Sequence, residues 1–140
     1  MEALERFLAP YPSRSYKKGE MILSIDEKPS HGFAIREGII KTYNIDSQGN
    51  EHPVTLDVKN DFFPLGWIQG HIDLTLYFYE AFTNCTVTCF DRDELKSAMQ
   101  TDAQLTSEIY FRVSERFLDL QQRIEALEQS RAAHKIIFTS

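Results

Sequence analysis

The amino-acid sequence predicts a mainly β domain, a sandwich or barrel, followed by one long helix. From Lys17 to Phe63, turn residues separate short runs rich in Ile, Val, Phe, Tyr and Thr, a spacing typical of all-β domains. After Thr101 the pattern changes to apolar residues at helical spacing. The chain has 140 residues, 42% of them hydrophobic, which is enough for one ordinary domain with a core.

The β part contains several short strands and one clear hairpin. Strands are expected at residues 20–25, 32–36, 39–45, 52–58, 76–82 and 86–90, with a shorter pairing around 61–63. In the hairpin, the runs IIKTYNI and HPVTLDV flank the polar segment SQGN, where Gly49 can supply the positive φ of a turn. Cys85 and Cys89 are the only cysteines and share one strand face, so we expect buried thiols; a redox pair is the alternative.

Two short helices are expected beside these strands. Glu2–Ala9 can form a helix that Pro10 and Pro12 end. Asp91, with Glu94 three residues later, is typical of a capping box and predicts a helix over residues 92–100. We expect the first of these helices to cap the β part.

The long helix is expected over residues 101–130, opened by a second capping pair at Thr101 and Gln104. Its apolar residues recur at steps of three and four, close to a heptad seam in the second half: Leu105, Ile109, Val113, Phe117, Leu120, Ile124 and Leu127. About 28 helical residues span about 42 Å, more than such a domain needs to cover itself. We therefore expect a parallel homodimer whose interface contains Phe117, Leu120, Ile124 and Leu127. The alternative is a helix packed only on its own β domain.

Composition and charge argue against several functions. The net charge of −6 makes DNA binding by this segment itself unexpected, because affinity for DNA rests on clustered Lys and Arg. The N-terminus has neither a signal peptide nor a membrane span, so we expect a cytoplasmic protein without a membrane partner. No nucleophile group, glycine-rich phosphate loop or paired-carboxylate motif stands out, and we do not expect an enzyme. Asp57 and Asp61 are interpreted as turn or capping residues.

Several short motifs occur in a familiar order. They are Tyr16 with Lys18-Gly19-Glu20 and Ile22, Ile35 with Glu37-Gly38-Ile39-Ile40-Lys41 and Tyr43, the Gly49 hairpin, Asp61-Phe62-Phe63, and Asp91-Arg92-Asp93-Glu94-Leu95. In this order and spacing they resemble the N-terminal sensor domain of Crp/Fnr-type bacterial transcription regulators. The resemblance implies a cyclic-nucleotide-binding-like double-stranded β-helix, or jelly roll, followed by a dimerisation helix.

The resemblance also implies a division of the chain. Residues 1–100 would form the sensor domain, residues 101–130 the dimerisation helix, and residues 131–140 the start of a connector to a winged helix-turn-helix domain. In the family that downstream domain binds DNA, so DNA would be a partner only through a domain that is not in this chain. A truncated regulator is expected on this interpretation, and a stand-alone sensor is the alternative.

The stretch that would bind a cyclic nucleotide departs from the family pattern. Members that bind cyclic AMP carry a Gly-Glu pair for the ribose and an Arg-Ser pair for the phosphate; Pro64-Leu65 and Thr75-Leu76 stand at about those places here. Residues 60–91 contain neither Lys nor Arg. A buried phosphate without a cation forgoes a bond worth about 1.5–3 kcal/mol. We therefore expect that the usual mode of cyclic AMP binding is lost.

Aromatic and apolar residues occupy this stretch instead. A possible small-molecule effector, apolar or flat, would contact Phe63, Pro64, Leu65, Gly66, Trp67, Tyr77 and Tyr79. Tyrosine hydroxyls, the Trp67 N–H or Gln69 could orient it. The alternative is that the rings fill the barrel, in a regulator controlled by its abundance or by a protein partner. The sequence leaves the cofactor unknown.

A metal-dependent cupin-like jelly-roll enzyme is the alternative from another functional class. The four histidines, His31, His52, His71 and His134, are scattered, and none forms the His-x-His pair with a following Glu that a cupin metal site requires. Three of them could still meet in space. Haem sensing through His71 is a further possibility within the regulator family.

Overall fold

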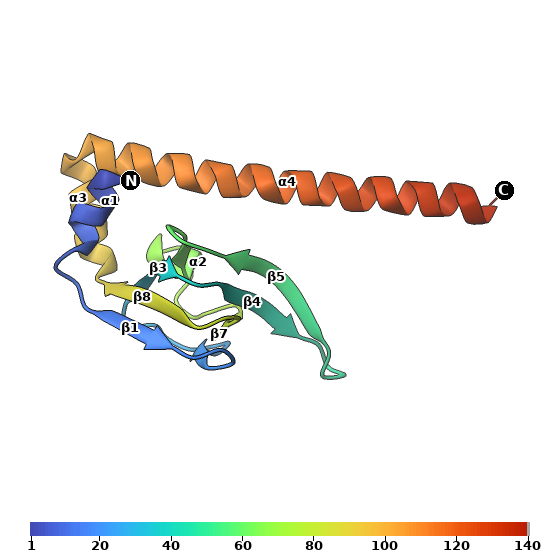
Figure 1. Cartoon of the computed structure of the whole chain (residues 1–140), viewed down its shortest axis with the longest axis horizontal. Helices are drawn as coiled ribbons and strands as arrows, with labels where there is room; N and C mark the ends of the chain where they lie inside the picture. Colours follow the sequence, from blue (N-terminus) through green and yellow to red (C-terminus); the bar gives the residue numbers. More distant parts are fainter. Residues whose placement is uncertain (140) are drawn as a thin grey trace.

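Two β-sheets and four helices make up the chain in the computed structural model, which describes residues 1–139, with side chains through residue 133 (Figure 1). In chain order the elements are α1 Glu2–Leu8, β1 Ser13–Tyr16, β2 Met21–Leu23, β3 Gly32–Glu37, β4 Ile40–Ile45, β5 Glu51–Asp57, β6 Phe62–Phe63, α2 Leu65–Ile68, β7 Phe78–Ala81, β8 Cys85–Phe90, α3 Arg92–Thr101 and α4 Ala103–Thr139.

The strands form two four-stranded sheets with antiparallel neighbours. One sheet has the order β1-β8-β3-β6 and the other β2-β7-β4-β5, so neighbours in space are mostly distant in sequence. The hairpin β4–β5 is the exception, and its turn contains Gly49 at φ +85°. The predicted jelly-roll sandwich with a long C-terminal helix is confirmed, and so is the predicted hairpin.

Alternate residues of the strands divide the apolar side chains between two clusters. On β3, Phe33 and Ile35 lie in the core between the sheets, while Ala34 packs toward the helices. On β8, Cys85 and Cys89 lie in the inter-sheet core as free, buried thiols, which confirms the prediction for them. Burial raises the pKa of both thiols, so neither is poised to react.

Two elements were not predicted from the sequence. Strand β1 pairs with β8 along its whole length, yet its residues SRSY are mostly exposed and show no apolar alternation. It is an edge strand that backbone hydrogen bonds hold, so it lacks the pattern by which buried strands are recognised. The one-turn helix α2 was missed because its four residues are too few to show a helical period.

Helix α3 begins where the sequence predicts. The Asp91 carboxylate accepts hydrogen bonds from the N–H groups of Asp93 and Glu94 at 2.8 and 2.9 Å, which confirms Asp91 as the N-cap. The Glu94 carboxylate accepts a hydrogen bond from the Tyr11 hydroxyl, and no bond from the Asp91 N–H to Glu94 that would complete a capping box is present among the described residues. The contact between Tyr11 and Glu94 holds α3 to the segment that follows α1.

Both predicted ends of the long helix differ from the structure. Thr101 is the last residue of α3, and Asp102 caps α4 by accepting a hydrogen bond from the Leu105 N–H at 3.0 Å. The helical backbone then continues without a break to Thr139, so the expected change near residue 130 does not occur. Side chains of residues 134–140, most of the expected connector, lie outside the described residues.

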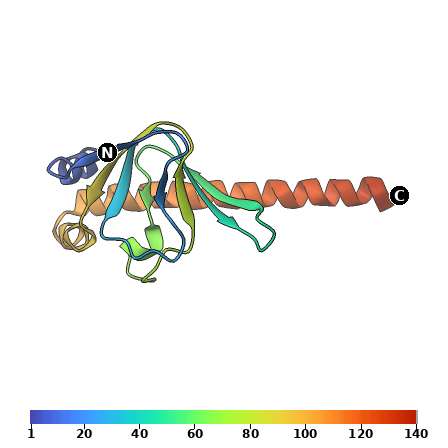
Figure 2. The same cartoon turned by 90° about the horizontal axis from the view of Figure 1, so that it is seen from below.

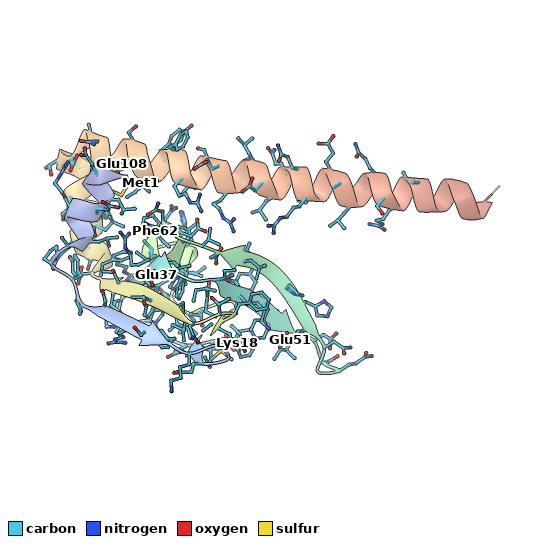
Figure 3. The ribbon with its side chains drawn as sticks, viewed as in Figure 1. Met1, Lys18, Glu37, Glu51, Phe62 and Glu108 are labelled. Atoms are coloured by element: carbon cyan, nitrogen blue, oxygen red, sulfur yellow. The ribbon has the colours of Figure 1, made fainter. Side chains whose placement is uncertain are left out.

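Only the first part of α4 is packed on all of its inner face. Leu105 and Ile109 are buried against α1 and α3, and the Glu108 carboxylate accepts hydrogen bonds from the N–H groups of Ala3 and Leu4 at 3.0 and 3.2 Å (Figure 3). The helix then passes along the sandwich and extends beyond it (Figures 1 and 2). Every residue from 117 to 133 is exposed. Within the described residues no helix is long and apolar enough to cross a membrane.

Gly38, between β3 and β4, should be the least replaceable of the turn glycines. Gly38 and Gly49 have nearly the same φ, +86° and +85°, but a Cβ at Gly38 would lie 2.3 Å from the Asn84 carbonyl oxygen, whereas Gly49 has open space. Gly49→Ala should lower the free energy of unfolding by about 1–2 kcal/mol through strain alone. Gly38→Ala should cost at least about 1 kcal/mol more. Urea unfolding at one protein concentration checks this, and equal losses would contradict it.

Candidate functional site

A cavity of about 390 Å³ lies between the sandwich and α4. Its floor comes from β4, β5 and β7, one side from the segment 61–66 and the loop 72–77, and its outer wall from four α4 residues, Val113, Arg116, Phe117 and Leu120. Figure 3 shows Phe62, one of its lining residues, between α4 and the sheets. The volume is within the range of small-molecule sites. A ligand here would touch the sensor sheets and the long helix together.

Two other hollows contain few of the expected site residues. One, of about 390 Å³, lies between α2, α3 and α4 and includes Leu65 and Gln69. The other is a wide, shallow surface hollow beside Tyr110 where α3 meets α4. The cavity under α4 is the candidate because the expected residues gather there.

Five of the seven expected ligand-binding residues line the cavity: Phe63, Leu65, Gly66, Tyr77 and Tyr79. Pro64 is fully buried and does not line it. Trp67 packs toward α3, with the Arg92 guanidinium 4.1 Å from its ring centroid and Arg92 Nη1 donating to its carbonyl oxygen at 2.7 Å. The Trp67 N–H is therefore not in a position to orient a ligand in this cavity.

The four residues expected at a dimer interface divide into two pairs. Phe117 and Leu120 line the cavity, although they are 60% and 37% exposed in the single chain. Ile124 and Leu127 lie farther along α4 and are 61% and 64% exposed. The apolar residues of the heptad seam are therefore buried within the chain at Leu105 but exposed on its surface at Ile124.

Stacked rings fill the barrel interior but leave the cavity open. The Phe63 ring stacks on the rings of Phe33 and Tyr79, with centroid distances of 5.0 and 5.1 Å. All three side chains are buried in the inter-sheet core. The alternative in which aromatic rings fill the barrel thus describes its centre, while space remains on the side that faces α4.

Four charged side chains link α4 to the sandwich at the edge of the cavity. Arg112 Nε donates to Asp61 Oδ1 at 2.8 Å, and Arg116 Nη2 donates to Asp57 Oδ1 at 3.0 Å and to the Leu56 carbonyl at 2.8 Å. Arg116 Nε also lies 3.6 Å from Asp61 Oδ2. Asp61 is 5% exposed. We call Asp57, Asp61, Arg112 and Arg116 the ionic clasp.

Sequence reasoning missed the clasp. Asp61 does accept a turn hydrogen bond, from the Val58 N–H at 2.8 Å, so its expected turn role is only part of its function. The stretch expected to bind a ligand, residues 60–91, contains neither Lys nor Arg, and the arginines of the clasp come from α4. Their spacing of four residues on one helix face, Arg112 and Arg116, was the available signal.

The clasp is desolvated and almost fully hydrogen-bonded. Burial raises the pKa of Asp57, and the nearby Asp61 carboxylate raises it further, while a hydrogen bond of 2.9 Å from Thr42 Oγ1 and the Arg116 charge oppose the shift. Burial and the Asp57 charge raise the pKa of Tyr79 above its usual range, so its hydroxyl stays protonated. None of the hydrogen bonds that hold the clasp involves that hydroxyl.

Thr75, which stands where the phosphate-binding arginine would be, does not face the cavity. It is fully buried, its hydroxyl donates to the Ser24 carbonyl at 2.5 Å, and it accepts a hydrogen bond from the Glu27 N–H at 2.9 Å. Thr75 thus holds the loop after β2. Arg116 is the one basic residue lining the cavity in the described part of the chain.

The described residues contain no group of three or more His, Cys, Asp or Glu side chains that could hold a metal ion. His52, near the start of β5, has its Nε2 2.7 Å from Asp46 Oδ2 beside the β4–β5 turn, and it does not line the cavity. The side chain of His134 lies outside the described residues. No observation on the described residues supports a cupin-type metal centre.

Removing the guanidinium of Arg116 should destabilise the fold. Arg116→Met leaves Asp57 without its cation and should lower the free energy of unfolding by about 1–3 kcal/mol at neutral pH. The loss should shrink as the pH falls through the raised pKa of Asp57, because protonation removes the uncompensated charge.

Arg131→Met is the matched control, since Arg131 pairs with Glu128 on the same helix but both side chains are about two-thirds exposed, at 69% and 66%. It should cost less than about 0.5 kcal/mol. Urea unfolding at fixed protein concentration measures both variants. Equal effects, or a loss at Arg116 that does not depend on pH, would refute the clasp's role.

Comparison with known proteins identifies the domain. Residues 13–102 match the cyclic nucleotide-binding domain family. No curated protein sequence matches the chain. Among solved structures, the c-di-GMP-responsive global regulator CLP of Xanthomonas campestris is 18% identical with a TM-score of 0.73, and the alignment covers 86% of this chain and 61% of that one.

Two further structures share the fold. A transcriptional regulator from Thermotoga maritima is 17% identical, with a TM-score of 0.72 and 86% and 94% of the two chains covered. The sensor domain of the transcriptional regulator DNR from Pseudomonas aeruginosa is 18% identical, with a TM-score of 0.64 and coverages of 87% and 79%. The chain therefore belongs to the cyclic nucleotide-binding domain family, in agreement with its resemblance to the sensor domains of Crp/Fnr-type regulators.

Proposed function

We propose that this chain is the sensing and dimerisation part of a Crp/Fnr-like transcription regulator, and that an effector other than cyclic AMP in its usual mode occupies the cavity under α4. The observation that carries the proposal is the composition of the cavity wall. Sheet residues form its floor and α4 residues its outer side, so a ligand contacts both. A ligand that binds one α4 position better than another shifts the population of helix positions.

The site offers little to a cyclic phosphate. Leu65 stands where the ribose-binding Glu would be, and the Thr75 hydroxyl is bound to the loop after β2. Arg116 is paired with Asp57 and lies near Asp61, so its charge is largely neutralised and a phosphate beside it would also face those two carboxylates. The lost arginine contact alone corresponds to about tenfold to a hundredfold in affinity.

The free surface of α4 supports dimerisation. Large apolar side chains remain exposed along it, including Phe117, Ile124 and Leu127 at 60%, 61% and 64%. A helix with this much exposed apolar surface gains stability by packing against a second helix. We assign the partner as a second copy of the chain, with its seam at Phe117, Leu120, Ile124 and Leu127.

DNA recognition is assigned to a separate domain. The net charge of −6 disfavours phosphate binding by these residues themselves. The chain spans 61% of the length of the Xanthomonas regulator, so DNA binding by a complete protein is part of the proposal. We assign no catalytic role to the chain, and the absence of a metal-binding group among the described residues gives the cupin alternative no support.

Cyclic AMP should not bind at micromolar concentrations. Isothermal titration of the full chain should give no saturable heat with the nucleotide, because residues 60–91, which would bind it, contain neither Lys nor Arg. Leu76→Trp, which places a large ring at the cavity rim, is the companion variant, since Leu76 lines the cavity and is 50% exposed. Saturable micromolar binding that disappears in Leu76→Trp would contradict the proposal.

Charging the α4 seam should give a folded monomer. Ile124→Glu combined with Leu127→Glu replaces apolar contacts by like charges, and neither residue lines the cavity. Gln122→Glu with Ala126→Glu adds the same charge to exposed positions outside the seam. Light scattering should report a dimer for the wild type and control and a monomer for the seam variant. A dimer that persists in the seam variant would exclude this interface.

A further inference from the structure

The carboxylate oxygens at the cavity already accept hydrogen bonds from neighbouring protein groups. Asp57 Oδ1 accepts from Arg116 and Oδ2 from Thr42, while Asp61 Oδ1 accepts from Arg112 and Oδ2 from the Val58 N–H. All four carboxylate oxygens therefore have a donor. A cationic ligand would have to share these oxygens with the two guanidinium groups already bound there, whose positive charges repel it.

An anionic ligand is disfavoured because the arginine that it would need is already paired with carboxylates. The only cation that lines the cavity within the described residues, Arg116, also donates to the Leu56 carbonyl at 2.8 Å. An anion that recruited it would expose the buried carboxylates of Asp57 and Asp61 to one another and to the anion. Like charges brought together in a desolvated site repel strongly. The clasp thus disfavours both signs of charge.

Two phenol hydroxyls remain available at the cavity. Tyr79 is 6% exposed and lines the cavity, and its hydroxyl takes no part in the hydrogen bonds of the clasp. The Tyr77 side chain also lines the cavity and stands outside the clasp. The rest of the lining near them is apolar, including Phe63, Leu76 and Phe117. A hydroxyl in an apolar cavity favours a ligand that brings a hydrogen-bonding group to it.

We infer that the effector is an uncharged, largely apolar small molecule whose single polar group hydrogen-bonds to the Tyr79 hydroxyl. This inference rests on the proposed role of the cavity as the effector site. It excludes nucleotides and other phosphate esters as a class, and also carboxylates and amines. The clasp acts as a charge filter because it satisfies its own four ions and leaves a neutral surface to the ligand.

Three probes with one ring system test the charge filter. They are 2-naphthylmethanol, which is uncharged, 2-naphthoate, an anion, and 2-naphthylmethylammonium, a cation. Isothermal titration of the full chain should show the alcohol binding at least about tenfold more tightly than either ion, since an ion must compete with clasp hydrogen bonds of about 1.5–3 kcal/mol each. Tyr79→Phe should weaken the alcohol about twofold to tenfold and leave 2-methylnaphthalene unchanged.

Two tryptophan variants localise the binding. Leu76→Trp should abolish binding of the alcohol, whereas Met21→Trp, at an exposed position of β2 away from the cavity, should not. Circular dichroism confirms that each variant is folded. If an ion binds as tightly as the alcohol and Leu76→Trp removes it, the ligand class is wrong and the proposed effector site stands. If no probe binds, or if Leu76→Trp leaves binding unchanged, both the inferred ligand class and the proposed effector site are wrong.

Discussion

The ionic clasp between α4 and the sandwich determines where the long helix lies. Most of α4 beyond Val113 has no packed core beneath it, and Arg112 and Arg116 are the side chains that hold this part of the helix to Asp57 and Asp61. These carboxylates stand at the end of β5 and in the turn before β6. The clasp therefore connects the sheet that floors the cavity with the helix that closes it.

A clasp of this kind suits a sensor better than an apolar interface would. Buried ion pairs add little net stability, because desolvation offsets their attraction, but they impose a specific geometry. Its loss would release the outer wall of the cavity without disturbing the stacked rings of Phe33, Phe63 and Tyr79 in the core. The first turns of α4 are held independently by Leu105, Ile109 and Glu108, so the helix has a natural pivot at that end.

The sequence predicts local structure well where the pattern is short-range. The β4–β5 hairpin follows from alternating apolar residues around Gly49, and the start of α3 follows from Asp91, because both depend on residues a few positions apart. The edge strand β1 escaped prediction because its backbone, and not its side chains, holds it to β8. The end of the long helix was misplaced because nothing local stops it near residue 130.

In the candidate site, too, residues close together in the sequence were predicted and contacts between distant residues were not. Five of its aromatic and apolar residues were found because they lie in one stretch, from Phe63 to Tyr79. Trp67 lies in the same stretch but does not line the cavity, because its ring packs beneath Arg92, which position in the sequence does not reveal. The clasp joins residues more than fifty positions apart, so only the fold brings Asp61 to Arg112. The spacing of Arg112 and Arg116 marks one face of the helix, but it does not identify the carboxylates with which that face pairs.

The most direct test of the account is the arginine side-chain Nε–H spectrum of the isotopically labelled chain, assigned by single Arg→Lys variants. The clasp predicts resolved, slowly exchanging signals for Arg112 and Arg116, averaged and fast-exchanging ones for Arg131, and loss of the Arg112 signal in Asp61→Asn. Signals from Arg112 and Arg116 that exchange with water as fast as that of Arg131 would contradict the claim that these ion pairs fix α4 above the cavity.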